Sequence, residues 1–482
     1  MRKLIFLYFL MISGMGISQM TISNMIEQQS SGNFFQNRSI ISLKQAGFVL
    51  LNAKSEYLNS QTEFIVEKYD SAFKFEWQMY FKPNFKYEFQ KTFVNKTHLH
   101  FLFMENETTN IGVFRMNLVT GENEFFEGNL LTRMKVEQFK VLKNKAYIGG
   151  NYNDRPVIVA FNFHDLNSKI LQDVHANHIE INNLEVLENK DQMLAFLKDD
   201  RNCLTMIKAY NYDGKLANTY KLGGRDMNLI SSKVLISKTG QHFLVGNYSN
   251  ICTEFAEGIY MLDLSDPKTE NLTLMPFIKL NNFYNFMPKK QRERIQKRNE
   301  NRENKGKNNN QKYKINLHEI YENGDENILI GEIYNTEFKA NSAMIPSLTT
   351  NNLGQNYRFS HAVILGFDEN GKILWDNSIS LEGLVSNNLD QKVQLNLTNE
   401  LNLLAYPKEG AIFSVATKKS EIIQEKQRFN LEENKMVKSF FNEESNLLAW
   451  YDNHFLVWGT QNIGLTETFY IKKLTYGLIN GK

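Results

Sequence analysis

A short apolar run that ends in a small or polar residue recurs along this chain of 482 residues and constrains its fold more than any other feature. Successive runs start 53, 46, 47, 49, 85, 84 and 43 residues apart, so the period is near 47 residues and two units carry insertions. The runs begin at Gly47, His100, Ala146, Met193, His242, Asn327, Ala411 and His454.

Each run is followed by a second apolar run, such as Val157–Phe163 or Gly258–Leu264. Several of these second runs are followed by a turn dipeptide, such as Asp213-Gly214 or Asn370-Gly371. The runs are short and rich in Ile, Val, Phe, Tyr and Leu, which favours strands over helices. The dipeptides supply the positive φ angles that two-residue hairpin turns require. About four short strands in one repeat match a blade of a β-propeller.

We therefore predict an all-β chain that folds as a single β-propeller of eight blades over residues 19–482. Seven blades are the alternative if the weak unit at Ala411 belongs to its neighbour, and a pair of stacked β-sandwiches is the alternative architecture. We expect an N-terminal strand, at Ser39–Leu43, to complete the last blade, because such closure removes exposed sheet edges.

Residues 1–18 have the three parts of a secretory signal peptide. The basic pair Arg2-Lys3 precedes the apolar stretch Leu4–Ile12, and Gly16-Ile17-Ser18 predicts cleavage before Gln19. The apolar stretch is too short to span a bilayer core of ~30 Å, although an uncleaved anchor is the alternative. We expect an exported protein without a transmembrane segment, periplasmic by first preference and extracellular by second.

The chain has two cysteines, Cys203 and Cys252, which lie in neighbouring repeat units. Export permits a disulfide. Equivalent points on adjacent blades, however, are usually farther apart than the Cα limit of ~7 Å for a bridge. We therefore expect two unpaired cysteines that serve as small hydrophobic side chains.

Basic residues gather in the first insertion, at about 284–314, where residues 289–314 contain eleven Lys or Arg and three Glu. Its first half has the composition of a helix, and its second half that of a disordered segment. The segment is a candidate docking arm for an acidic partner, an anionic lipid surface or a polyanion, and a solvated loop is the alternative. Because no aromatic residue interrupts the basic run, nucleic acid is not an expected partner. The candidate partner-binding residues are Lys289, Lys290, Arg292, Arg294, Lys297 and Arg298.

The second insertion, at about 335–360, is rich in Asn, Ser and Thr and is interpreted as a polar surface loop. His100, His242 and His454 share one repeat position, which favours a structural role over a joint metal site. The sequence contains no recognisable P-loop, nucleophile elbow or zinc-binding spacing. We therefore assign no catalytic, cofactor-binding or metal-binding residue and expect no cofactor.

The segment Phe367–Trp375, FDENGKILW, resembles a turn phrase of exported bacterial propellers in the quinoprotein-like and WD40-like repeat superfamily. The resemblance implies the architecture alone. The paired marks of WD40 blades do not recur, and the four tryptophans are too few for the regular pattern of quinone-dependent dehydrogenases.

These features favour a non-catalytic interaction scaffold of the bacterial cell envelope, which docks onto an envelope or secretion assembly through one propeller face and its long loops. The expected partner is therefore a protein, such as an outer-membrane or secretion-system component. The alternative is a carbohydrate-active or sugar-binding propeller with a site at the central channel.

Overall fold

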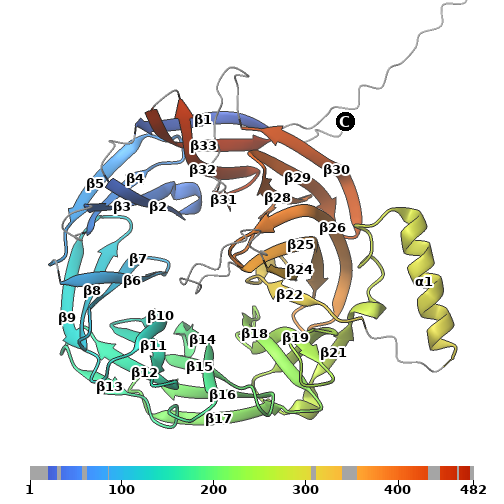
Figure 1. Cartoon of the computed structure of the whole chain (residues 1–482), viewed down its shortest axis with the longest axis horizontal. Coiled ribbons are helices and arrows are strands. Elements are labelled where there is room, and N and C mark those ends of the chain that lie inside the picture. The colour runs from blue at the N-terminus through green and yellow to red at the C-terminus, as the bar shows by residue number, and fades with distance from the viewer. Residues whose placement is uncertain are drawn as a thin grey trace, which may run out of the picture. The chain divides into compact units, whose positions relative to one another are not determined.

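The computed structural model describes residues 20–29, 34–56, 62–84, 86–305, 311–338, 355–431, 446–463 and 466–477. These residues form eight antiparallel sheets, each with the strand order of a propeller blade (Figure 1). The fold is thus all-β, an eight-bladed β-propeller, as the repeat predicts. The expected signal peptide, residues 1–18, lies outside the described residues.

Six blades belong to one compact unit, the six-blade unit, which comprises Ser31–Val393 and Thr417–Ile422. Blade one comprises β2 Phe34–Ser42, β3 Phe48–Glu56, β4 Thr62–Tyr69 and β5 Phe75–Phe81. Blade two comprises β6 Tyr87–Val94, β7 His98–Glu105, β8 Asn110–Asn117 and β9 Asn123–Asn129. Blade three comprises β10 Lys135–Leu142, β11 Lys145–Tyr152, β12 Arg155–Asn162 and β13 Ser168–Ile170. Blade four comprises β14 Ile179–Leu187, β15 Gln192–Asp199, β16 Leu204–Asn211 and β17 Leu216–Gly223. Blade five comprises β18 Asn228–Ile236, β19 His242–Ser249, β20 Gly258–Asp263 and β21 Thr273–Pro276. Blade six comprises β22 Lys314–Leu317, β24 Glu326–Phe338, β25 Gln355–Phe367 and β26 Ile373–Ser386, with β23 Tyr321–Asn323 paired to β24.

The recurring apolar run is the second strand of each of these six blades, where both faces of the sheet are covered. All eight residues of β19 are buried, whereas four of the eight residues of the outer strand β17 are exposed. Neighbouring sheets supply the covering side chains, so one cluster joins β19 and β20 of blade five to β24 and β25 of blade six. Burial between sheets therefore explains why the second strands lack the polar alternation of a half-exposed strand.

The remaining blades lie in the two-blade unit, apart from Thr417–Ile422 at the junction of β29 and β30; this unit contains Gln394–Ala416, Ile423–Lys482 and the N-terminal residues to Ser30. They are β27 Gln394–Leu397, β28 Asn402–Lys408, β29 Ala411–Lys418 and β30 Glu421–Asn430; and β31 Asn446–Ala449, β32 His454–Ile463 and β33 Thr466–Tyr476 with β1 Met20–Gln29.

Two sequence assignments in these blades are corrected. An N-terminal strand does complete the last blade, but it is β1, which pairs with β33 from Met20 opposite Tyr476. Ser39–Leu43 is instead largely part of β2, because blade one needs that segment as its first strand. The run at Ala411 is a third strand, and the second strand of its blade is β28, where Pro407 interrupts the apolar run.

The expectation of unpaired cysteines was wrong, because Cys203 and Cys252 form a disulfide with a Cα–Cα distance of 5.6 Å. Cys203 lies between β15 and β16, and Cys252 lies between β19 and β20 of the next blade. The second connection leaves eight residues between its strands, so it is long enough to reach the neighbouring blade.

Outside the strands, the described residues include four short 3-10 helices and the α-helix α1, Lys289–Glu303. The 3-10 helices are Lys44–Ala46, Glu188–Lys190, Thr269–Asn271 and Phe277–Lys279. In the second insertion, 335–338 and 355–360 continue β24 and β25 as strands, and 339–354 lie outside the described residues. None of the helices in the described ranges is both long and apolar enough to cross a membrane.

Candidate functional site

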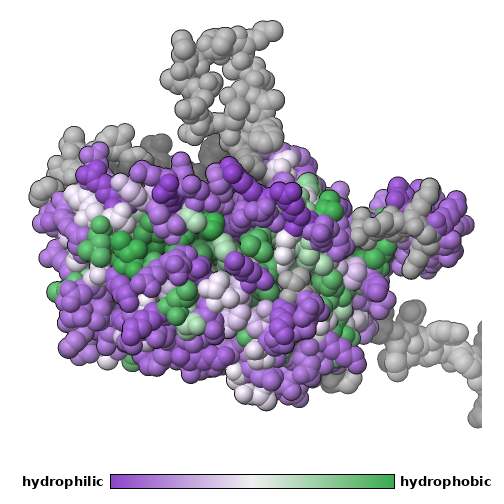
Figure 2. All heavy atoms as spheres, turned by 90° about the horizontal axis from the view of Figure 1, so that it is seen from below, coloured by the Kyte–Doolittle hydropathy of each residue, from purple (hydrophilic) through white to green (hydrophobic). Residues whose placement is uncertain are grey.

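Helix α1 forms the basic part of the first insertion, on the connection from β21 of blade five to β22 of blade six. Figure 1 shows it on the outer side of these blades, in yellow, and Figure 2 shows it as a largely hydrophilic projection at the right. Seven of its fifteen residues are Lys or Arg and three are Glu. The helix is therefore a positively charged arm attached to the rim of the six-blade unit.

One side of α1 packs against the propeller. Arg292, Ile295, Asn299 and Arg302 are half-buried, at the spacing of one helix face. Ile295 contacts the apolar cluster between blades five and six. The guanidinium of Arg292 donates from Nη1 to Asn285 Oδ1 at 2.6 Å. This side is an anchor, because its apolar and polar groups meet partners in the body.

The other side of α1 faces solvent and carries most of its charge. Five of the six predicted partner-binding residues are exposed, and the sixth, Arg292, belongs to the anchoring side. Glu293 and Glu300 are exposed beside them, so the outward face keeps an excess of positive charge. The exposed basic residues are Lys289, Lys290, Arg294, Lys297 and Arg298.

The chain that leads into α1, residues 281–287, binds the outer strand β26. Backbone N–H groups of Asn281 and Asn282 donate to the Asp376 carboxylate at 3.1 and 2.6 Å. The Phe286 N–H donates to Ser378 Oγ at 3.1 Å, and that hydroxyl donates to the Asn282 carbonyl at 2.9 Å. Burial raises the pKa of Asp376, and the two amides act in the opposite direction. We call residues 281–287 the first leg of the arm.

Aromatic ring contacts also hold this first leg. The Phe286 ring stacks on His361 of β25 with ring centroids 3.7 Å apart, and Phe283 meets the same imidazole edge-on at 5.3 Å. His361 is buried, and its Nδ1 lies 2.9 Å from Ser360 Oγ. Burial lowers the pKa of His361 to about 3, so the imidazole is neutral near pH 7.

The chain that leaves the helix region, residues 311–314, forms the second leg. Tyr313 and Ala256 exchange two backbone hydrogen bonds at 2.8 and 2.9 Å. Lys312 pairs with the buried carboxylate of Glu257 at 3.0 Å, and Lys314 pairs with Glu254 at 2.6 Å. The first leg and the half-buried side of α1 thus hold the basic face of the helix at a defined place, where it can bind carboxylates or phosphates through charge.

Sequence reasoning found the charge of the arm but not its attachment. The contact between Asn282 and Asp376 joins positions 94 residues apart, and no local pattern encodes it. The aromatic residues Phe277, Phe283, Tyr284 and Phe286 just before the helix were the available signal, because such density is unusual in a solvated loop.

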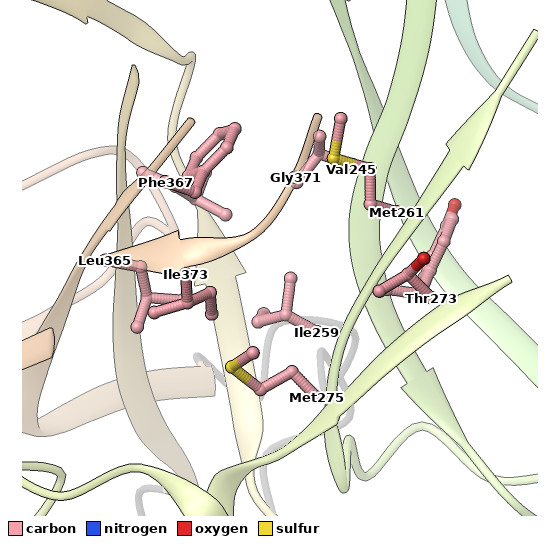
Figure 3. A pocket seen from close by; sticks show the side chains of 11 residues that line it. Val245, Ile259, Met261, Thr273, Met275, Leu365, Phe367, Gly371 and Ile373 are labelled. Atoms are coloured by element: carbon pink, nitrogen blue, oxygen red, sulfur yellow. The ribbon is translucent and has the colours of Figure 1, made fainter. Parts of the chain in front are cut away.

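A cavity of about 340 Å³, counting space open to solvent, lies between blades five and six (Figure 3). Val245, Ile259 and Met261 line one side, and Leu365 and Phe367 line the other. None of its eleven lining residues is charged. The cavity therefore belongs to the apolar packing between the two sheets.

The histidines at the shared repeat position are packed within their blades. His100 and His242 are buried, and burial lowers the pKa of His100 to about 3. His454 Nδ1 lies 3.0 Å from Thr475 Oγ1 of the neighbouring strand β33. Within the described ranges, no group of three or more His, Cys, Asp or Glu side chains is arranged to hold a metal ion.

The fold and the arm together define the class: an eight-bladed β-propeller that carries an anchored basic helix on one side. No family model matches the chain, and no curated protein matches it either. Among solved structures, it is similar to the polysaccharide lyase Uly1, with 10% identity over 94% of this chain and 99% of the other and a TM-score of 0.39.

Two further structures share the architecture. The β-propeller domain of the Trilobed protease from Pyrococcus furiosus is 11% identical over 80% of this chain and 93% of the other, with a TM-score of 0.38. A quinoprotein alcohol dehydrogenase-like protein from Bacteroides thetaiotaomicron is 13% identical over 73% and 69%, with a TM-score of 0.36. Their names span different activities, so the likeness concerns the fold alone.

Proposed function

We propose that this chain is a non-catalytic interaction scaffold of the bacterial cell envelope, on which the outward face of helix α1 binds an acidic protein partner. The supporting observation is the anchored basic face, because the first leg and Ile295 hold the helix while Lys290, Arg294, Lys297 and Arg298 stay exposed. Their spacing places these four side chains along one strip of the helix.

The character of the strip favours a protein partner over a membrane. An interfacial membrane helix inserts an apolar face between lipids. In α1 the apolar residue Ile295 faces the body and contacts its core. The outward face therefore offers charge without an apolar surface for insertion, which suits the carboxylates of an acidic protein. Such contacts speed association and are sensitive to salt.

The envelope setting rests on two supports. The expected signal peptide would direct the chain out of the cytoplasm. The disulfide between Cys203 and Cys252 suits an oxidising compartment, where such bonds form and persist. A periplasmic location is the first expectation, and an extracellular one is the second.

The test is purification of the tagged protein from its native envelope, followed by mass spectrometry of the proteins that accompany it. A variant with Lys290, Arg294, Lys297 and Arg298 changed to Glu should lose an acidic partner that the wild type retains. The matched control changes four exposed lysines elsewhere in the six-blade unit: Lys96, Lys215, Lys221 and Lys372. Retention of the same partner by both variants would refute docking at the helix.

A further inference from the structure

The disulfide and the basic arm share one segment, the connection between β19 and β20, residues 250–257. Cys252 in this segment is bonded to Cys203 of blade four. Cys203 is buried, whereas Cys252 is exposed. The connection is therefore tied to blade four near its start, while its other end meets the second leg of the arm.

The contacts with the second leg begin two residues after Cys252. The Glu254 carboxylate pairs with Lys314 at 2.6 Å, and the same ammonium lies 5.4 Å from the ring centre of Phe255. Ala256 then forms its two backbone hydrogen bonds with Tyr313. Three consecutive residues of the connection thus hold the segment that follows helix α1.

Hydrogen bonds other than the disulfide also hold parts of this connection, and they show which residues should not respond to reduction. The Glu257 N–H donates to the Tyr248 carbonyl at 2.7 Å, and the Glu257 carbonyl accepts from Phe277 at 2.9 Å. Glu257 and its ion pair with Lys312 are therefore held by the blade itself. Between Cys252 and Ala256, the Thr253 carbonyl accepts a hydrogen bond from Asn228 Nδ2 at 2.6 Å.

We propose that the Cys203–Cys252 disulfide positions the second leg of the arm, so that its reduction loosens the backbone pairing between Ala256 and Tyr313. This inference rests on the proposed function only in calling α1 the docking element. The first leg, bound to Asp376, should keep its place in both redox states.

The redox step requires an external dithiol reductant. Its thiolate attacks the exposed Sγ of Cys252 and breaks the S–S bond, and the Cys203 thiolate leaves and takes up a proton. The second thiol of the reductant then attacks the mixed disulfide and releases Cys252 as a thiol. The protein disulfide gains two electrons and two protons, and the dithiol becomes a disulfide.

Hydrogen exchange of the full mature chain, followed by mass spectrometry before and after dithiothreitol, tests the proposal. We expect exchange at the Ala256 and Tyr313 amides to become about tenfold faster on reduction, because these amides lose a covalent restraint on local opening. The Asn281 and Asn282 amides of the first leg are the internal control and should not change.

A variant with Cys203 and Cys252 both changed to Ser should reproduce the reduced pattern without reductant. Unchanged exchange at Tyr313, with increases confined to residues 200–203 and 251–253, would overturn the proposal. Loss of protection throughout β19 and β20 would also overturn it, because the disulfide would then stabilise the whole blade. No partner enters this experiment, so its failure is distinct from a failure of the docking proposal.

Discussion

Lys198 and Glu332 occupy the same position in the second strands of blades four and six, and each ties its blade to the segment that enters the next. Lys198 Nζ donates to the Leu229 carbonyl at 2.8 Å and to the Asn228 side chain. Glu332 Oε1 accepts from the N–H groups of Lys392 and Val393 at 2.8 and 2.6 Å. Both side chains are buried, so an amino group and a carboxyl group make equivalent contacts at equivalent positions.

Removing the carboxylate of Glu332 should destabilise the six-blade unit. In Glu332→Ala, the N–H groups of Lys392 and Val393 lose their acceptor in a buried place, at a cost of roughly 2–4 kcal/mol in the free energy of unfolding. Glu332→Gln keeps an acceptor oxygen and should lose less. Urea unfolding of both variants measures the difference, and equal losses would show that the acceptor role is wrong.

Because of Lys198, the stability of the protein should change with pH in the alkaline range. Burial lowers the pKa of Lys198 to about 8 in the folded state, below its ordinary value of 10.5. Between these two pH values the unfolded chain binds more protons, so stability rises with pH, by at most about 1.4 kcal/mol per pH unit. Below pH 8 the full penalty for the buried charge is present.

Lys198→Met should remove this rise. The measurement is the free energy of unfolding at pH 8.0 and 9.5 for both proteins, because the difference between them cancels the contribution of the buried tyrosines. Parallel pH profiles would mean that Lys198 keeps its ordinary pKa in the folded protein.

Because of His361, the stability of the protein should change with pH in the acidic range. The folded-state pKa of His361, about 3, lies below the ordinary histidine value of 6.5, so the unfolded state takes up the proton first as pH falls. Stability should therefore decrease from pH 6.5 downwards. His361→Phe keeps an aromatic ring to stack on Phe286 and should lose less stability between pH 7 and 5, as thermal unfolding would show. The pKa of His100 is also lowered, but its contribution to stability is the same in both proteins and cancels in the comparison. An identical loss in both proteins would contradict the assignment.

The first leg should control how well the arm resists protease. Asp376→Ala removes the acceptor for the Asn281 and Asn282 amides, so trypsin should cleave within α1 several-fold faster while the blades remain intact. Asp376→Asn retains a side-chain oxygen that can accept one of these bonds and should be cleaved at an intermediate rate. Cleavage of all three proteins at one rate would show that the leg does not depend on this carboxylate.

The apolar run predicted the blades because it reports burial between sheets, a property that each repeat carries locally. It failed at β28, where Pro407 shortens the run, and at the closing strand, because β1 and β2 both have strand-forming sequences near the N-terminus. The disulfide was missed because blade spacing describes strands, whereas Cys252 lies on a connection that reaches across. Charge composition located the arm, but its two legs depend on partners that only the fold brings near.

The most direct test of the docking face uses a defined acidic probe in place of the native partner. A fluorescent polyglutamate peptide is titrated with the wild type, the four-residue α1 reversal and the four-lysine control, at low and high salt. We predict that the α1 reversal weakens binding by at least about tenfold, that the control does not, and that salt weakens the wild-type complex. Equal binding by all three proteins, or binding to anionic phosphatidylglycerol vesicles without binding to the peptide, would contradict a protein-docking helix.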